Sequence, residues 1–251
     1  MITKIISKYI KINKLTYIFI LLSIFTASFR ILFYMFFLII IHELGHFITA
    51  KIFGIELDKV YIYPLGGVAK FYMPYNFSAV KELIILINGP LFQEIAKIIL
   101  IYLFPQHTNL ITTYHYSILL FNLLPIYPLD GGRIVNIIFS SFKPFKKSLK
   151  ITISISYIII FILFLININN IKINILVLVS FLVYKVYKED KSINLKYENF
   201  LLERYLNKYK FKNSKIINNS NNFYKNKRHL IKENDKYILE NEFLLKKYQK
   251  T

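Results

Sequence analysis

Long apolar segments dominate this sequence and restrict the folds that the chain can adopt. Hydrophobic residues make up 55% of its 251 residues. Several segments approach or exceed the roughly 20 apolar residues that a helix needs to cross a bilayer. Because these segments are continuous and do not alternate with polar residues, they predict helices and not a β-barrel. We expect six membrane spans, at about 15–29, 31–52, 79–104, 110–140, 150–168 and 171–187.

A different pattern separates the second and third spans. Around Pro64 and the Gly66-Gly67 pair, the sequence is rich in β-favouring residues, which predicts a small β-hairpin. The chain is therefore predicted to be a polytopic α-helical membrane protein with about six transmembrane helices, a β-hairpin between helices 2 and 3, and a short cytoplasmic tail. We place the membrane domain at residues 1–187 and the polar tail at 188–251.

The distribution of positive charge predicts how the chain lies in the bilayer. The formal net charge is +19, and the flanks on one side of the membrane hold most of the Lys residues outside the tail. The opposite flanks carry only Arg30 and Lys172. Since basic flanks face the cytoplasm, we expect an integral, multi-pass protein with both termini in the cytoplasm. The same pattern favours contact with the lipid bilayer over a nucleic-acid partner. The basic flanks contain Lys4, Lys8, Lys11, Lys14, Lys51, Lys59, Lys70, Lys81, Lys143, Lys146, Lys147 and Lys150.

The second span ends in the run His42-Glu43-Leu44-Gly45-His46. Residues four apart share one face of a helix, so His42 and His46 can direct two imidazoles at one metal ion. Glu43 is then placed to act as a general base toward a metal-bound water. Ionisable residues are costly inside a membrane segment, which favours a functional site here. The run predicts a zinc-dependent peptide hydrolase.

The third metal ligand must also be His, Asp or Glu, because the chain contains no Cys. A catalytic zinc keeps three protein ligands and leaves a fourth position for water. Asp130 is the best candidate, because it lies at a Pro- and Gly-rich break, residues 125–133, in the fourth apolar segment. Asp58, in a predicted turn, and Glu94, deeper in the third span, are the alternatives.

Other polar residues receive simpler interpretations. Glu94 and Lys97 are three residues apart and are expected to pair as a contact between helices. We expect His107 and His115 at membrane-interface positions and His229 on the surface of the tail. In the tail we expect a helix at about 195–210, an Asn-rich loop at 216–222 and a short strand and helix within 229–247.

Several motifs, taken in order, resemble those of the site-2-type intramembrane zinc metalloproteases, over about residues 30–140. The resemblance implies that His42, His46 and Asp130 bind zinc, that Glu43 is the catalytic acid and base, and that Asn122 faces the substrate or the developing oxyanion. Gln93 departs from the family, many of whose members have Asn there. The motifs are His42-Glu43-Leu44-Gly45-His46, Gly66-Gly67, Asn88-Gly89-Pro90 and Asn122-x-x-Pro125-x-x-Pro128-Leu129-Asp130-Gly131-Gly132-Arg133.

The span count and the tail are similar to the sporulation subgroup of this family. Residues 200–205 and 227–229, followed by 239–248, resemble parts of the CBS module of that subgroup, here shortened or degenerate. The resemblance implies a membrane-associated substrate, the precursor of sporulation sigma factor K, and inhibitory membrane partners. It also implies a location in the mother-cell membrane around the forespore. We expect the hairpin, with Gly66 and Gly67, to bind an unwound substrate as an added strand.

Three alternative functions are compatible with parts of this pattern. A site-2-type protease could act on another tethered regulator. A metal or proton transporter could use the same buried His and Asp residues, although transport usually needs further polar residues within the membrane, and this chain has few. A catalytically inactive scaffold is disfavoured by the intact set of His42, Glu43, His46 and Asp130.

Overall fold

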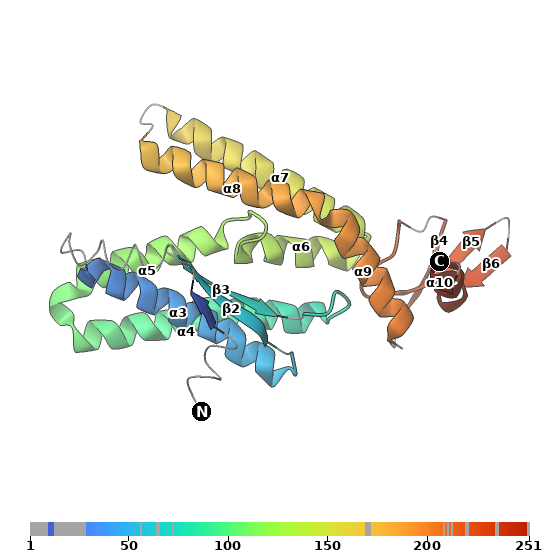
Figure 1. Ribbon diagram of the computed structural model, residues 1–251, viewed down its shortest axis with the longest axis horizontal. Helices are drawn as coiled ribbons and strands as arrows, with labels where there is room; N and C mark the ends of the chain where they lie inside the picture. Colours follow the sequence, from blue (N-terminus) through green and yellow to red (C-terminus); the bar gives the residue numbers. More distant parts are fainter. Residues whose placement is uncertain are drawn as a thin grey trace. The chain divides into compact units, whose positions relative to one another are not determined.

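A computed structural model describes residues 10–12, 29–55, 57–63, 66–71, 73–168, 172–207, 209, 211, 213–218, 221–233 and 236–249. The chain divides into two compact units. The first contains residues Met1–Met73 and Val80–Asn122, and the second contains Pro74–Ala79 and Leu123–Thr251. Figure 1 labels the helices and strands of both units.

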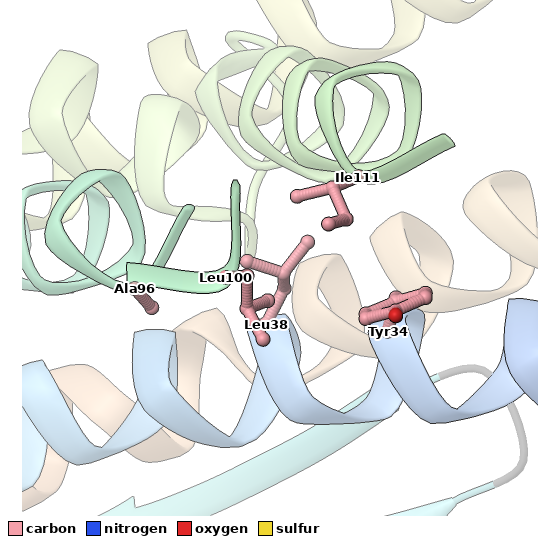
Figure 2. Close-up of a cluster of buried hydrophobic side chains, with 5 residues drawn as sticks. All are labelled: Tyr34, Leu38, Ala96, Leu100 and Ile111. Carbon is pink, nitrogen blue, oxygen red and sulfur yellow. The ribbon is translucent and has the colours of Figure 1, made fainter. Parts of the chain in front are cut away.

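The first unit is built around three helices. These are α3 (Phe29–Ile52), α4 (Ala79–Leu103) and α5 (Thr108–Leu123), with the short 3₁₀ helix η1 (Pro105–His107) before α5. Their buried side chains meet in one cluster (Figure 2). Tyr34 and Leu38 come from α3, Ala96 and Leu100 from α4, and Ile111 from α5. This cluster packs α3, which carries His42 and His46, against α4, which carries the residues that contact them.

A small sheet accompanies these helices in the first unit. β2 (Leu57–Tyr63) pairs antiparallel with β3 (Gly66–Phe71), within the region where the hairpin is predicted. β1 (Ile10–Ile12) adds a third strand, parallel to β2. No pattern in its sequence indicated this strand. Asp58 lies in β2, at a shift in the register with β3, and not in the predicted turn.

After residue 123, the second unit contains α6 (Asp130–Phe142), followed by α7 (Phe145–Ile166) and α8 (Ile173–Lys191). α7 and α8 run side by side (Figure 1). The predicted fourth span is therefore interrupted, since α5 ends at Leu123 and α6 starts at Asp130. The predicted break at residues 125–133 overlaps this interruption and extends into the first turn of α6. Pro125 and Pro128, which lie in the interruption, explain why the helix does not continue.

The tail folds into a helix, a three-stranded sheet and a final helix. These are α9 (Ile193–Leu206), β4 (Ser214–Ile217), β5 (Arg228–Glu233), β6 (Lys236–Leu239) and α10 (Glu240–Gln249). β5 is the central strand, parallel to β4 and antiparallel to β6. The predicted helix agrees with α9, whereas β4 extends into the segment that was predicted as a loop.

His229 was predicted to lie on the surface of the tail, and this is wrong. The His229 side chain is fully buried, and its Nδ1 atom lies 2.9 Å from the carboxylate Oε2 of Glu240. Removal from water lowers the pKa of His229, although the Glu240 carboxylate favours the protonated ring. A neighbouring buried partner, which lies eleven residues later in the sequence, offsets the cost of burying this imidazole.

Three helices among the described residues are long and apolar enough to cross a membrane: α3, α4 and α7. The predicted first span falls almost wholly in residues outside the described ranges. The predicted fourth span is divided between α5 and α6, which have 16 and 13 residues, less than a straight helical crossing needs. α8 covers the predicted sixth span, but its last turns are charged. The structure thus gives a mostly helical protein with three membrane-length helices and a small sheet in its first unit.

Candidate metal centre

His42 and His46 form the centre of the first unit's polar interior. They lie one turn apart on α3, and both are buried. Their Nε2 atoms are 3.1 Å apart, with the ring planes at 83°. The predicted convergence of the two imidazoles is therefore present.

The other nitrogen of each ring determines what the facing Nε2 atoms can do. His46 Nδ1 lies 2.8 Å from the carbonyl oxygen of Ile85, which can only accept a hydrogen bond. His46 therefore carries its proton on Nδ1, and its Nε2 presents a lone pair.

The same argument applies to His42 through the amide of Gln93. Gln93 Nε2 donates to the carbonyl oxygen of His115 at 3.0 Å, which turns its Oε1 toward His42. His42 Nδ1 donates to this Oε1 at 2.9 Å. Both His42 and His46 therefore direct an Nε2 lone pair at one position, and in neutral rings neither has the proton that a direct hydrogen bond would need. A cation fits this arrangement.

The polar chain continues beyond Gln93. Its Nε2 also lies 3.3 Å from His115 Nδ1, and His115 Nε2 lies 2.9 Å from Glu94 Oε2. Glu94 in turn pairs with Lys97, as predicted from their spacing. The hydrogen bonds run in one consistent direction, from the Nδ1 of His42 to the Oε1 of Gln93 and from the Nε2 of Gln93 to His115. The His115 side chain is fully buried among these partners.

Gly89 provides the space that the two imidazoles occupy. A Cβ atom on Gly89 would lie less than 3.0 Å from Cε1 and Nε2 of His46. Gly45 permits a similar close approach, because a Cβ there would collide with the carbonyl of Asn88. Small residues at such positions allow membrane helices to approach closely. The Asn88-Gly89-Pro90 motif thus has a steric role beside the histidines.

In the second unit, Asp130 is the first residue of α6 and is half-buried. A carboxylate is favoured at the positive end of a helix. Gly131 and Gly132 allow α6 to start close to the preceding loop, because a Cβ on either would collide with backbone atoms of residues 123–127. The loop is also held by Ser156 of α7, whose Oγ accepts the Tyr127 N–H at 2.8 Å.

The remaining predicted site residues lie on defined elements. Glu43 follows His42 on α3 and is half-buried. Asn122 is half-buried in the last turn of α5. Gly66 and Gly67 are the first residues of β3, opposite Tyr63 and Ile62 of β2.

Comparisons with known proteins agree with this chemistry. The family model for Peptidase family M50 matches residues 30–110 and 106–166. Stage IV sporulation protein FB of Bacillus subtilis is 32% identical over 199 residues, which cover 74% of this chain and 68% of that protein. Zinc metalloprotease MJ0392 of Methanocaldococcus jannaschii is 36% identical over 171 residues, 64% of this chain and 49% of that protein. The solved Site-2 Protease from Methanocaldococcus jannaschii matches with a TM-score of 0.56 and 27% identity, over 72% of this chain and 89% of that one.

The membrane-length helices, the converging histidine pair and these similarities together define a membrane metalloprotease. The chain belongs to peptidase family M50, and its cofactor is zinc. The two converging Nε2 lone pairs fit this metal, because zinc in proteins is bound by neutral imidazole nitrogens whose other ring nitrogen is hydrogen-bonded.

Replacing Gln93 with leucine is expected to weaken zinc binding about 10–100-fold, the usual cost of losing a hydrogen-bond partner of a metal-binding His. Leucine has a similar volume but cannot accept the Nδ1 proton of His42. Chelator competition on purified protein measures the zinc affinity. Gln106→Leu, at an exposed position of η1, is the matched control and should bind zinc as tightly as the wild type. Equal affinities for the two variants would contradict the assigned tautomer.

The variant Gly89→Ala is expected to lose zinc while remaining folded as a helical membrane protein. Alanine favours helix more than glycine does, but its methyl group would displace the His46 ring. Zinc content after purification measures this effect, and circular dichroism reports the helix content. Gly54→Ala is the contrasting variant. A Cβ atom at this position meets nothing within 4 Å, but the backbone φ is +76°. The substitution should therefore strain the backbone locally and leave the zinc content unchanged. Full zinc occupancy in Gly89→Ala would refute the steric role.

Proposed function

We propose that this chain is a site-2-type intramembrane endopeptidase that cleaves a membrane-tethered protein near the cytoplasmic face. The observation that carries the proposal is that the Nε2 atoms of His42 and His46 lie 3.1 Å apart. Glu43 directly follows His42 on the same helix. This is the donor set and the general base that metal-assisted peptide hydrolysis requires.

Asp130 is proposed as the third zinc ligand. His42, His46 and Asp130 each carry one ligand atom that could hold a metal ion. Of the two alternatives, Glu94 is already engaged by Lys97 and His115. Asp58 lies within a paired strand. Three protein ligands leave one position for water, as a catalytic zinc requires.

Each remaining residue has a proposed task in the reaction. Zinc in such a site acidifies its bound water and polarises the peptide carbonyl. Glu43 accepts a proton from the attacking water and delivers it to the leaving amine, so that the amine departs neutral. The Asn122 amide faces the substrate and donates to the developing oxyanion.

The substrate is proposed to bind beside β3. This strand stands at one edge of the described three-stranded sheet, in the order β1-β2-β3, so its outer edge can pair with an unwound substrate segment. Gly66 and Gly67 would contact that segment through their backbones. A strand-blocking Val68→Pro variant should lose cleavage and keep its zinc. Full activity would remove the hairpin from substrate binding.

The similarity to Stage IV sporulation protein FB supports a more specific proposal. The substrate is then the precursor of sporulation sigma factor K, and inhibitory membrane partners hold the protease inactive. In this proposal the protein has six membrane spans, and both of its termini lie in the cytoplasm. Its location is the mother-cell membrane around the forespore. Residues 188–251 are a shortened or degenerate CBS module, because the strand–strand–helix order of β5, β6 and α10 follows α9 and a single further strand.

Co-expression with tethered candidate substrates tests the function. Wild type should release a soluble fragment from the precursor of sigma factor K, and Glu43→Gln should not. Release from a different tethered regulator alone would support the broader protease and reject the sigma factor. If neither is cleaved and Glu43→Gln carries metal or proton flux equal to that of the wild type in vesicles, the transporter interpretation replaces the protease.

A further inference from the structure

The tail helix α9 contacts two separate segments of the second unit. One is the connector at residues 74–78, which continues into α4. The other is the loop at residues 124–129, which continues into α6. α9 itself starts beyond all the predicted membrane spans. Each of these two segments leads along the chain into a helix, α4 or α6, that carries residues of the proposed metal site.

The first contact fixes the connector by its backbone. The Glu203 carboxylate accepts the N–H groups of Tyr75 and Asn76, at 3.0 and 3.1 Å, and the Asn76 side-chain amide at 3.2 Å. The same amide donates to the carbonyl of Phe200 at 3.0 Å, and Asn76 Oδ1 accepts from Arg204 Nε at 2.7 Å. Every polar group of the Asn76 side chain is thus bound by α9. Hydrogen bonds to a charged partner are among the stronger ones.

The Arg204 side chain is itself held in place by the rest of the tail. Its guanidinium pairs with Glu240 of α10 at 2.7 Å and donates to the carbonyls of Tyr224 and Lys225 at 2.6 and 2.9 Å. Arg204 is 5% exposed, so water does not compete freely for these bonds. The connector is therefore tied to the folded tail and not to a mobile surface side chain.

The second contact reaches the loop before Asp130. Lys196 of α9 pairs with Glu189 and donates to the Tyr127 hydroxyl at 3.2 Å, with its Nζ 4.6 Å from the centre of that ring. The backbone N–H of Tyr127 donates a hydrogen bond to the Ser156 hydroxyl. Since Tyr127 precedes Asp130 by three residues, its position limits where α6 can begin.

Only a few residues separate each contact from the start of the helix that carries residues of the proposed metal site. Asn76 lies three residues before Ala79, the first residue of α4, and α4 carries Ile85, Gly89 and Gln93. A helix transmits a displacement of its first turn along its length more faithfully than a loop does. A misplacement of about 1 Å can reduce a reaction rate about 100-fold even when its origin is remote.

We propose that α9 is a positioning element of the protease, in which Glu203 with Arg204 sets the start of α4 and Lys196 sets the loop that leads to Asp130. The inference rests on the proposed function, because it assigns these residues to the same zinc site. It makes the tail part of the catalytic unit: anything that separates α9 from the connector lowers turnover without touching a zinc ligand.

The variant Glu203→Gln tests the first contact. Glutamine has the same shape but offers one acceptor, and its amide group faces the donors of Asn76. We expect kcat to fall about 10-fold or more, with KM for the tethered substrate unchanged. Glu198→Gln is the matched control on the same helix. It loses the ion pair with Lys247 but has no contact with the connector, and its kcat should equal that of the wild type.

A cross-link separates positioning from a folding defect. The chain has no Cys, so Asn76→Cys with Glu203→Cys gives one reactive pair in the full-length protein. A short cleavable bismaleimide should restore kcat at least 5-fold in this double variant, and cleavage of the linker should remove the gain again. In Asn76→Cys with Glu198→Cys, the same reagent should restore nothing.

These outcomes distinguish the two proposals. If wild type itself does not cleave tethered substrates, the proposed function fails. If wild type cleaves them and Glu43→Gln does not, but Glu203→Gln matches Glu198→Gln and the cross-link has no effect, the positioning role of α9 is wrong and the protease stands.

Discussion

Replacing Glu43 with glutamine is expected to lower kcat about 10²–10⁴-fold, the usual contribution of a general acid and base, while the purified protein keeps its zinc. Glutamine has nearly the same volume but cannot accept a proton from water. The His42 and His46 tautomers depend on Gln93 and Ile85, so the variant leaves the metal-binding pair intact. Fragment release from a tethered substrate and elemental analysis of zinc measure the two effects separately.

The control for this variant is Glu82→Gln, which removes a carboxylate from the first turn of α4 and should cleave at the wild-type rate. Two results would contradict the role of Glu43. Cleavage by Glu43→Gln at the wild-type rate would exclude it as the base. Loss of zinc from Glu43→Gln would make this residue part of the metal-binding structure instead.

The variant Asp130→Asn is expected to lose both zinc and activity. An amide oxygen carries no charge and is a much weaker ligand for zinc than a carboxylate. We expect zinc affinity to fall by more than the roughly 10–100-fold that an indirect partner costs, and turnover to fall with it. Chelator competition and fragment release, measured on the same preparation, give both numbers.

Asp190→Asn, in the charged last turns of α8, is the matched substitution outside the site. It should change neither the zinc affinity nor the rate of fragment release. If Asp130→Asn bound zinc like the wild type, the third ligand would have to be reassigned. Asp58→Asn would then be the next variant to measure, since Glu94 is held by Lys97 and His115.

Much of the fold follows from local patterns in the sequence. Continuous apolar segments predicted α3, α4 and α7, and the Pro and Gly residues around Asp130 predicted the break between α5 and α6. Four-residue spacing on a helix was enough to predict that His42 and His46 converge, because that geometry is fixed by the helix itself. Each of these features depends on residues close in sequence.

The features that the sequence did not reveal depend on distant pairs. Gln93 contacts His42 across 51 positions, and Asn76 contacts Glu203 across 127. No periodicity encodes such distances. A polar signal was nevertheless present, since His115 and Glu94 are ionisable residues within apolar helices, where unpaired charges are costly and partners are expected. His229 was misplaced for the same reason, because its partner Glu240 is brought to it only by the folded tail.

Zinc K-edge X-ray absorption on the purified full-length protein tests the central claim most directly. With His42, His46 and Asp130 as ligands and one position left for water, the spectrum should contain two imidazoles and two oxygen ligands, at distances of about 2.0–2.2 Å. In His46→Ala, one imidazole contribution should disappear or the zinc should be lost. A wild-type spectrum with no imidazole contribution, or one unchanged in His46→Ala, would contradict a zinc site built on this histidine pair.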